Sequence, residues 1–158
     1  MYKRVLVPLD GSPVAEAIVP FILQIAGPLD MAVRLLAVVE PVQPTMVEDP
    51  GFVMIQDLDA RTRSAEEYLA PIAAELRGRG IEVEWEVRRG SAASTILAIA
   101  KSWGADLIAM TTHGRSGLGR LLFGSVAEHV LRHADVPVFL MRQTEAQLAA
   151  RAAKEMMR

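Results

Sequence analysis

Short apolar stretches alternate with helix-like stretches along the whole chain of 158 residues, and this alternation constrains the fold more than any other feature. Most of the apolar stretches are typical of strands buried on both faces of a sheet. In residues 81–87 glutamates alternate with apolar residues, which is typical of an exposed or edge strand. The predicted strands are residues 5–9, 33–39, 81–87, 106–110 and 136–141.

Helical periodicity and helix-ending residues predict four helices between these strands. Ser12 followed by Pro13 is typical of a helix start, and Pro20 predicts a kink within that helix. Residues 41–51, which contain three prolines, predict an irregular loop. The predicted helices run from Ser12 to Gly27, from Leu58 to Arg77, from Ser91 or Ser94 to Gly104, and from Ser125 to His133.

Strands that alternate with helices in this way predict an α/β fold in which helices cover both faces of a parallel sheet. No linker or repeat interrupts the pattern, so we expect a single domain with a five-stranded, Rossmann-like sheet over residues 1–142. Residues 143–158 are predicted to form a C-terminal helical tail with a narrow apolar stripe at Leu148, Ala152 and Met156. Two interpretations of this tail stay open: a helix that contacts a second copy or another partner, and a frayed, solvated helix.

The charge and composition of the chain exclude several kinds of partner. It has 17 basic and 19 acidic residues and a formal net charge of −2, so we expect no nucleic-acid partner. It contains no cysteine, which excludes disulfides and thiolate chemistry. No apolar run approaches the length of about 18 residues that a membrane span needs. The apolar segment at residues 5–9 is too short for a signal-peptide core, so we predict a cytoplasmic protein without a membrane partner.

A glycine-rich segment follows the fourth predicted strand. Residues 114–124 contain four glycines and lead into a helix that starts at Ser125. Glycine lets backbone amides approach an anion, and a helix start adds free N–H groups and a favourable dipole. The alternative is an ordinary turn that Ser125 caps. The P-loop is excluded because Ser125 stands where its lysine would be, and no dinucleotide fingerprint follows the first strand.

Two segments resemble the universal stress protein family. They are VLVPLDGS at residues 5–12 and LIAMTTHGRSGLGRLLFGSVAEHVLRHADVPVFLMR at residues 107–142, and the likeness covers roughly residues 2–142. Its most specific part is Gly114 followed, after nine residues, by Gly124 and Ser125, which is similar to the later portion of the family's motif G-x2-G-x9-G-[ST]. The resemblance implies an adenine nucleotide alpha hydrolase-like fold. It also implies an adenine nucleotide, usually ATP, between strands one and four, with any Mg²⁺ carried in on the phosphates.

The resemblance also implies roles for individual residues. Pro8 and Asp10 would lie near the adenine and ribose, with Asp10 accepting hydrogen bonds from ribose hydroxyls. Val38 would offer its backbone to the adenine edge, and Met110 would pack near the base. Gly114 would let the chain pass the phosphates. The implied phosphate-binding set is Arg115, Ser116, Gly117, Gly124, Ser125, Val126 and Ala127, mostly through backbone amides.

Thr111 stands where the motif has its first glycine. Its branched side chain brings a methyl and a hydroxyl group to a place where glycine leaves space for a ligand. Two consequences stay open: the side chain crowds the ribose, or its hydroxyl forms a hydrogen bond with it.

Other candidate groups have structural explanations. His129 and His133 have the i, i+4 spacing of a metal pair, but no third ligand is evident, so we expect no metal site. His113 could serve as an acid–base group, and we favour a structural role because it has no identified carboxylate partner. Ser12, Ser91 and Ser125 all precede helices and are expected to cap them. No catalytic centre can therefore be identified from the sequence.

The strand at residues 136–141 has little sequence around it that would cover a free edge, and the resemblance implies a homodimer through this strand. We expect the tail to aid that contact if it packs. The function predicted is that of a stress-response or regulatory protein that binds ATP or another adenine nucleotide, with at most slow hydrolysis. The alternative is a homodimeric interaction module of the same fold that binds no nucleotide, which Thr111 favours. A third possibility is an ATP-dependent enzyme that uses Asp10 or His113.

Overall fold

A computed structural model describes residues 1–41, 50–114 and 124–157. In these residues five parallel strands form one sheet in the order β3-β2-β1-β4-β5, which confirms the predicted α/β fold. The strands are β1 (Arg4–Pro8), β2 (Ala32–Val39), β3 (Val83–Arg89), β4 (Leu107–Gly114) and β5 (Val138–Thr144). The segment predicted to be an exposed or edge strand forms β3, at one edge of the sheet.

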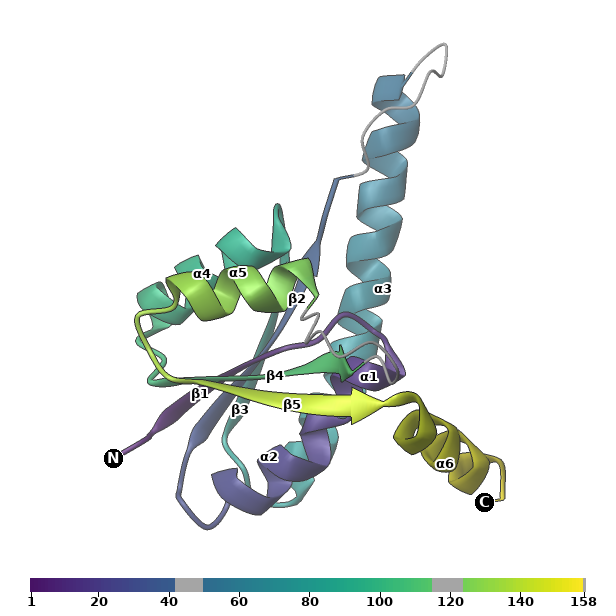
Figure 1. Ribbon diagram of the computed structural model, residues 1–158. Coiled ribbons are helices and arrows are strands. Elements are labelled where there is room, and N and C mark those ends of the chain that lie inside the picture. Colours follow the sequence, from purple (N-terminus) through teal and green to yellow (C-terminus); the bar gives the residue numbers. More distant parts are fainter. Residues whose placement is uncertain (42–49, 115–123, 158) are drawn as a thin grey trace.

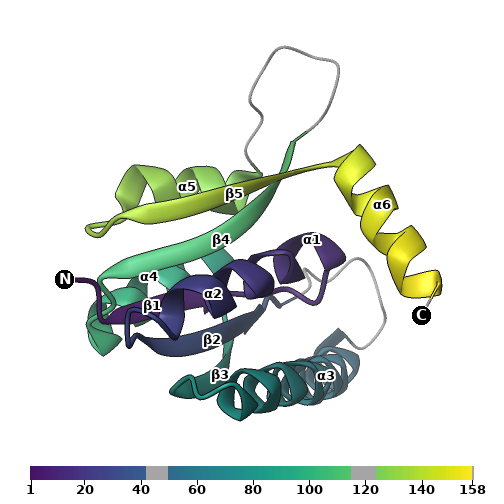
Figure 2. The same cartoon turned by 90° about the horizontal axis from the view of Figure 1, so that it is seen from below.

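Helices cover both faces of this sheet, and a last helix, α6, stands beyond the end of β5 (Figure 1, Figure 2). The helices α2 and α3 lie on one face, and α4 and α5 lie on the other. None of the helices in the described part of the chain is both long enough and apolar enough to cross a membrane. The helices are α1 (Pro13–Glu16), α2 (Ile18–Ala26), α3 (Pro50–Gly78), α4 (Ala92–Trp103), α5 (Ser125–His133) and α6 (Glu145–Met156).

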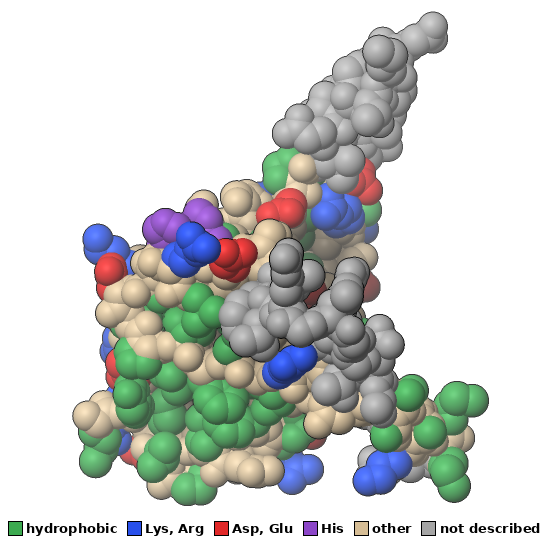
Figure 3. Space-filling model, in the orientation of Figure 1, with side chains coloured by type: hydrophobic (Ala, Val, Ile, Leu, Met, Phe, Trp, Pro, Cys, Tyr) green, Lys and Arg blue, Asp and Glu red, His purple; other side chains and the backbone are tan. Residues whose placement is uncertain are grey.

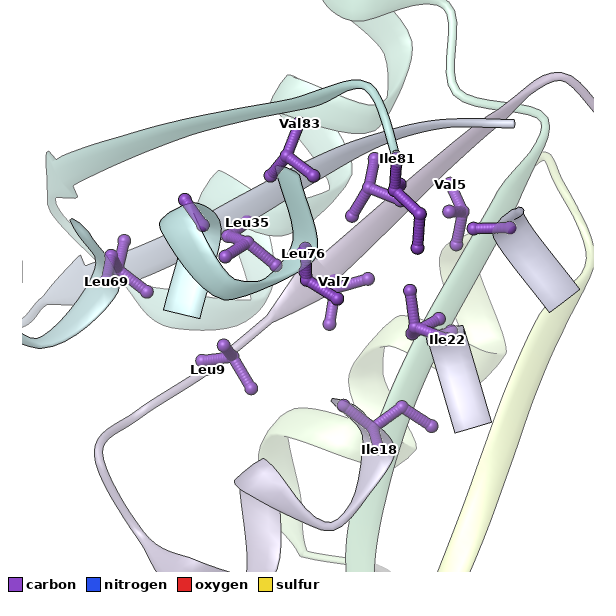
Figure 4. Close-up of a cluster of buried hydrophobic side chains, with 14 of the residues drawn as sticks. Val5, Val7, Leu9, Ile18, Ile22, Leu35, Leu69, Leu76, Ile81 and Val83 are labelled. Carbon is purple, nitrogen blue, oxygen red and sulfur yellow. The ribbon is translucent and has the colours of Figure 1, made fainter. Parts of the chain in front are cut away.

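Each face of the sheet has its own hydrophobic core. In β1, Val5 and Val7 point to the α2 and α3 side, whereas Leu6 points to the α4 and α5 side. Figure 4 shows the first of these cores, in which side chains of β1 and β2 meet those of α2 and α3. Burial of alternate residues on opposite faces explains why β1 and β2 are almost wholly apolar.

The first predicted helix is divided in two. Ser12 caps α1, because its Oγ accepts a hydrogen bond from the Ala15 amide at 3.1 Å, and Pro13 is the first helical residue. The helix breaks at Ala17, one turn before Pro20. Proline has no N–H to donate to the carbonyl four residues earlier, so the break precedes the proline itself, which lies in the first turn of α2.

Three predicted boundaries are wrong. The helix α3 begins at Pro50, eight residues before the predicted start at Leu58, so the predicted loop ends earlier. Residues 42–49 of that loop lie outside the described residues. The strand β4 continues through Gly114, and β5 continues through Thr144 into the predicted tail, because these two strands pair up to Gly114↔Thr144. The rest of the tail forms α6.

The capping roles predicted for Ser91 and Ser125 are also corrected. Ser91 is the N-cap residue of α4, but its side chain makes no capping hydrogen bond. Gly124 is the N-cap residue of α5, so Ser125 is already the first helical residue. Both helix starts therefore lack the serine cap that the sequence suggested.

Candidate functional site

The strands β1 and β4 separate toward their carboxyl ends. They pair only through Val5↔Leu107 and Leu6↔Ile108, whereas β1 pairs with β2 along all of its length. The chain order also reverses here, since β2 lies on one side of β1 and β4 lies on the other. A crevice at such a reversal is where open α/β sheets bind their ligands.

A cavity of about 740 Å³ occupies this crevice, within the range of roughly 300–1,000 Å³ typical of small-molecule sites. Its walls come from the carboxyl ends of β1, β2 and β4 and from the first turns of α1, α4 and α5. The described residues that line it are Pro8, Leu9, Asp10, Ser12, Val14, Ala15, Val38, Ala92, Ile96, Met110, Thr111, Thr112, Gly124, Ser125, Val126 and Ala127.

Most of the predicted site residues meet around this cavity. The structure brings together Pro8, Asp10, Val38, Met110, Thr111, Gly124, Ser125, Val126 and Ala127. Gly114 is the last residue of β4, not a loop residue. The remaining predicted residues, Arg115, Ser116 and Gly117, lie outside the described part of the chain.

Some lining residues were missed by the sequence reasoning. Ser12, Val14 and Ala15 follow β1, so the rule that ligands bind beyond strand ends could have found them. Ala92 and Ile96 come from α4, and nothing in their small or apolar side chains indicates a site. Only the packing of α4 against the sheet places them at the cavity.

The start of α5 presents backbone amides at the cavity that have no partner within the helix. No side chain caps this helix, and Ser125, Val126 and Ala127 of its first turn line the cavity. The first amides of a helix have no carbonyl partner within the helix, and the helix dipole makes this end positive. Thr112 anchors the start to β4, because its Oγ1 accepts a hydrogen bond from the Gly124 amide at 3.3 Å. This wall of the cavity therefore suits an anion such as phosphate.

The start of α4 differs, because a side chain from another part of the chain accepts a hydrogen bond from one of its backbone amides. The Ala92 amide donates a hydrogen bond to Glu40 Oε1 at 2.8 Å, so a carboxylate already serves this helix end. Beside it, Val38, Ile96 and Met110 give the cavity an apolar wall. A negative group would be repelled here, whereas an apolar group would be favoured. The cavity therefore favours a negative group at the start of α5 and an apolar group near the start of α4.

Asp10 places a carboxylate at the cavity beside β1. Its Oδ1 accepts a hydrogen bond from the Ser12 amide at 2.9 Å, which holds the side chain in the turn between β1 and α1. A carboxylate accepts hydrogen bonds and cannot donate them when ionised, so it suits a ligand part that carries hydroxyl groups.

Within the described part of the chain, no group of three or more His, Asp or Glu side chains is placed to hold a metal. His129 and His133 stack with their ring centroids 4.3 Å apart on the exposed face of α5 (Figure 3). The His133 Nδ1 lies 2.9 Å from the His129 carbonyl oxygen. The side chain of His113 lies outside the described residues.

A family model and a single related protein both match most of this chain in sequence. A model of the universal stress protein family matches residues 1–142. The chain is also 30% identical over 149 residues to the universal stress protein MJ0531 of Methanocaldococcus jannaschii, an alignment that covers 93% of this chain and 86% of that protein.

Solved structures agree with this match. The universal stress protein UspA from Lactobacillus plantarum superposes with a TM-score of 0.77 at 25% identity, covering 89% of this chain and 98% of that one. A universal stress protein family protein from Arabidopsis thaliana, solved with AMP bound, superposes with a TM-score of 0.64 over 92% of this chain and 94% of that one. Its identity is 18%, so this second likeness shows the fold alone.

Proposed function

This chain belongs to the universal stress protein family, and from that premise we propose that it binds an adenine nucleotide, ATP or a related one, in the cavity between β1 and β4. The contrast between the two helix starts carries this proposal. The α5 start faces the cavity without a side-chain cap, and the α4 start holds Glu40.

This contrast orients the nucleotide. The phosphates lie against the amides of Ser125, Val126 and Ala127, where the helix dipole favours negative charge. The base lies along the apolar wall by α4, away from the phosphates. The ribose lies between them, next to Asp10, whose carboxylate accepts hydrogen bonds from sugar hydroxyls. The Arabidopsis protein was solved with AMP bound, so this fold is able to hold such a ligand.

A regulatory or stress-response role fits this site better than rapid catalysis. Asp10 is the one carboxylate among the described lining residues, and its Oδ1 already accepts from the Ser12 amide. Any Mg²⁺ would therefore arrive with the phosphates, and we expect hydrolysis to be slow at most. We propose that the protein acts in the cytoplasm, where adenine nucleotides are abundant.

We also propose a homodimer formed through the edge of β5. Residues Val138, Phe139, Leu140 and Met141 are all apolar and only half-buried. Figure 3 shows hydrophobic side chains gathered on the face along which β5 runs in Figure 1. Pairing with a second copy would cover this edge. The helix α6 follows β5 directly, so we expect it to add to the contact.

The substitution Gly124→Val tests the nucleotide site. A Cβ at Gly124 would meet no atom of the described residues within 4 Å, and the φ of −55° is allowed for any residue. The valine side chain should therefore fit without strain and fill the space in front of the α5 amides. We expect ATP and AMP to bind at least about tenfold more weakly by isothermal titration calorimetry, a loss of roughly 1.4 kcal/mol.

Gly78→Val is the matched control, because a Cβ at Gly78, at the end of α3, also meets nothing within 4 Å. It should leave nucleotide affinity unchanged. Equal affinities in the wild type and Gly124→Val would reject the site. A wild type that releases no nucleotide when denatured and shows no thermal shift with ATP would favour the interaction module instead.

A further inference from the structure

The two threonines at the end of β4 differ in how their hydroxyl groups are used. Thr112 Oγ1 accepts a hydrogen bond from the Gly124 amide. Thr111 Oγ1 is buried and has no hydrogen-bond partner in the described part of the protein. Buried polar groups are nearly always paired, and an unpaired one lowers the free energy of unfolding. The Thr111 hydroxyl therefore needs a partner that the described residues do not provide.

The position of Thr111 indicates which part of a ligand it would meet. Successive side chains of a strand point to opposite faces, so Thr112 points toward α5 and Thr111 points toward the α1 and α2 side. The phosphate-binding amides belong to α5, on the other face. On its own face, at the cavity, Thr111 has the end of β1 and α1 as neighbours, and Asp10 lies between them.

The cavity can reach this side chain. Thr111 is partly exposed and lines the cavity, yet its Oγ1 is buried, so the exposed surface belongs to its other atoms. Rotation about the Cα–Cβ bond between staggered rotamers would exchange the hydroxyl with the methyl or hydrogen. The volume of about 740 Å³ is present with the threonine side chain in place, so the side chain does not fill the site.

We propose that the Thr111 hydroxyl turns into the cavity when a nucleotide binds and forms a hydrogen bond with a ribose hydroxyl. This inference rests on the proposed adenine-nucleotide function and makes Thr111 a residue that favours ribonucleotides over deoxyribonucleotides. A hydroxyl can donate and accept, whereas the Asp10 carboxylate only accepts. Thr111 and Asp10 can therefore hold the sugar hydroxyls from two sides.

The test compares AMP, 2′-deoxy-AMP and 3′-deoxy-AMP by calorimetry on the wild type, Thr111→Val and Thr111→Ser. Valine keeps the branched shape and removes the hydroxyl. We expect AMP to bind about threefold to tenfold more weakly to Thr111→Val, the range expected for one neutral hydrogen bond. The loss should vanish with the deoxynucleotide that lacks the bonded hydroxyl. Thr111→Ser, which keeps the hydroxyl, should bind AMP as the wild type does.

The ligand-free proteins provide a second readout. Because the hydroxyl has no partner among the described residues, Thr111→Val should unfold at the same urea concentration as the wild type or at a higher one. A residue with a purely structural hydroxyl would instead lower that midpoint. Thr111→Gly removes both the hydroxyl and the methyl, and we expect it also to bind AMP more weakly.

Tighter AMP binding by Thr111→Gly would mean that the side chain crowds the sugar, which overturns the inference. So would unchanged AMP affinity in Thr111→Val, or an equal loss for AMP and both deoxynucleotides. These results would leave the nucleotide function standing. A wild type that binds none of the three nucleotides and no ATP would overturn the function and this inference together.

Discussion

The sheet ends on one side in β3 and on the other in β5, and the side chains along these two edge strands differ in kind. On β3, Glu84 and Glu86 both pair with Arg34 of the neighbouring β2, and Glu86 also pairs with Arg88 at 2.9 Å. On β5, four consecutive apolar residues, 138–141, are all half-buried, and no ion pair is described for them.

The arginine of β2 that pairs with these glutamates is also held in place. The Arg34 guanidinium lies 4.6 Å from the centre of the Trp103 ring, and its side chain is only 21% exposed. Charged residues on an edge strand oppose the addition of another strand, because that strand would have to desolvate them. The difference is consistent with the proposed dimer, because the ion pairs of β3 oppose a further strand whereas the apolar residues of β5 do not.

The largest effect is expected from a charge placed on the apolar edge. Leu140→Lys puts an ammonium group in the middle of β5, where the proposed dimer would have to bury it. We expect the dimer dissociation constant to rise at least about 100-fold, which analytical ultracentrifugation can measure.

Val87→Lys is the control on the other edge, since Val87 is also a half-buried apolar residue of an edge strand. It should leave the association state unchanged. If both variants dissociate alike, or if the wild type sediments as a monomer, the contrast between the edges does not concern self-association.

The second effect concerns how β5 is attached to its own subunit. Phe139 stacks on Phe21 of α2, with the ring centroids 4.1 Å apart and the planes 5° from parallel. Phe139→Ala should lower the free energy of unfolding by about 2–3 kcal/mol, less than a fully buried phenylalanine would, and urea unfolding measures this. In a double-mutant cycle with Phe21→Ala, we expect a coupling of about 1 kcal/mol. Additive effects would show that the ring stack itself adds nothing.

The smallest effects are expected from the arginines that form ion pairs with the glutamates of β3. Arg34→Ala removes the partner of Glu84 and Glu86 and the contact with Trp103, so we expect a loss of about 1–2 kcal/mol of unfolding free energy. Arg88→Ala removes a cation that is 55% exposed and should cost less than about 0.5 kcal/mol. Urea unfolding at low and high salt compares the two, and equal losses would contradict the special position of Arg34.

The fold could be predicted from the sequence because its signals are local. Alternation of apolar strands with periodic helices needs no information from distant residues. Boundaries that depend on pairing between segments could not be predicted in this way. The strand β4 extends to Gly114 only because β5 runs beside it as far as Thr144. The early start of α3 could not be predicted because Pro50 and Gly51 are residues typical of loops. Proline is nevertheless tolerated in the first turn of a helix.

Some residues of the candidate site could also be predicted from local sequence signals, and others could not. Asp10 and Ser125 stand beside recognisable turns and could be predicted. Ala92 and Ile96 reach the cavity through the packing of α4, and nothing in the sequence marks them. The contrast between the two helix starts was hidden as well, because it depends on the hydrogen bond from the Ala92 amide to Glu40, which lies 52 residues earlier in the chain.

The register between β4 and β5 has a consequence for regulation. Met110 and Thr111, which line the cavity, pair directly with Leu140 and Met141 on the bare edge. A ligand in the cavity and a second subunit on the edge would therefore contact opposite sides of the same strand pair. If nucleotide binding changes the affinity between subunits by some factor, thermodynamic reciprocity requires association to change nucleotide affinity by that same factor. In the proposed dimer, β4 and β5 would be the element through which nucleotide binding and subunit association affect one another.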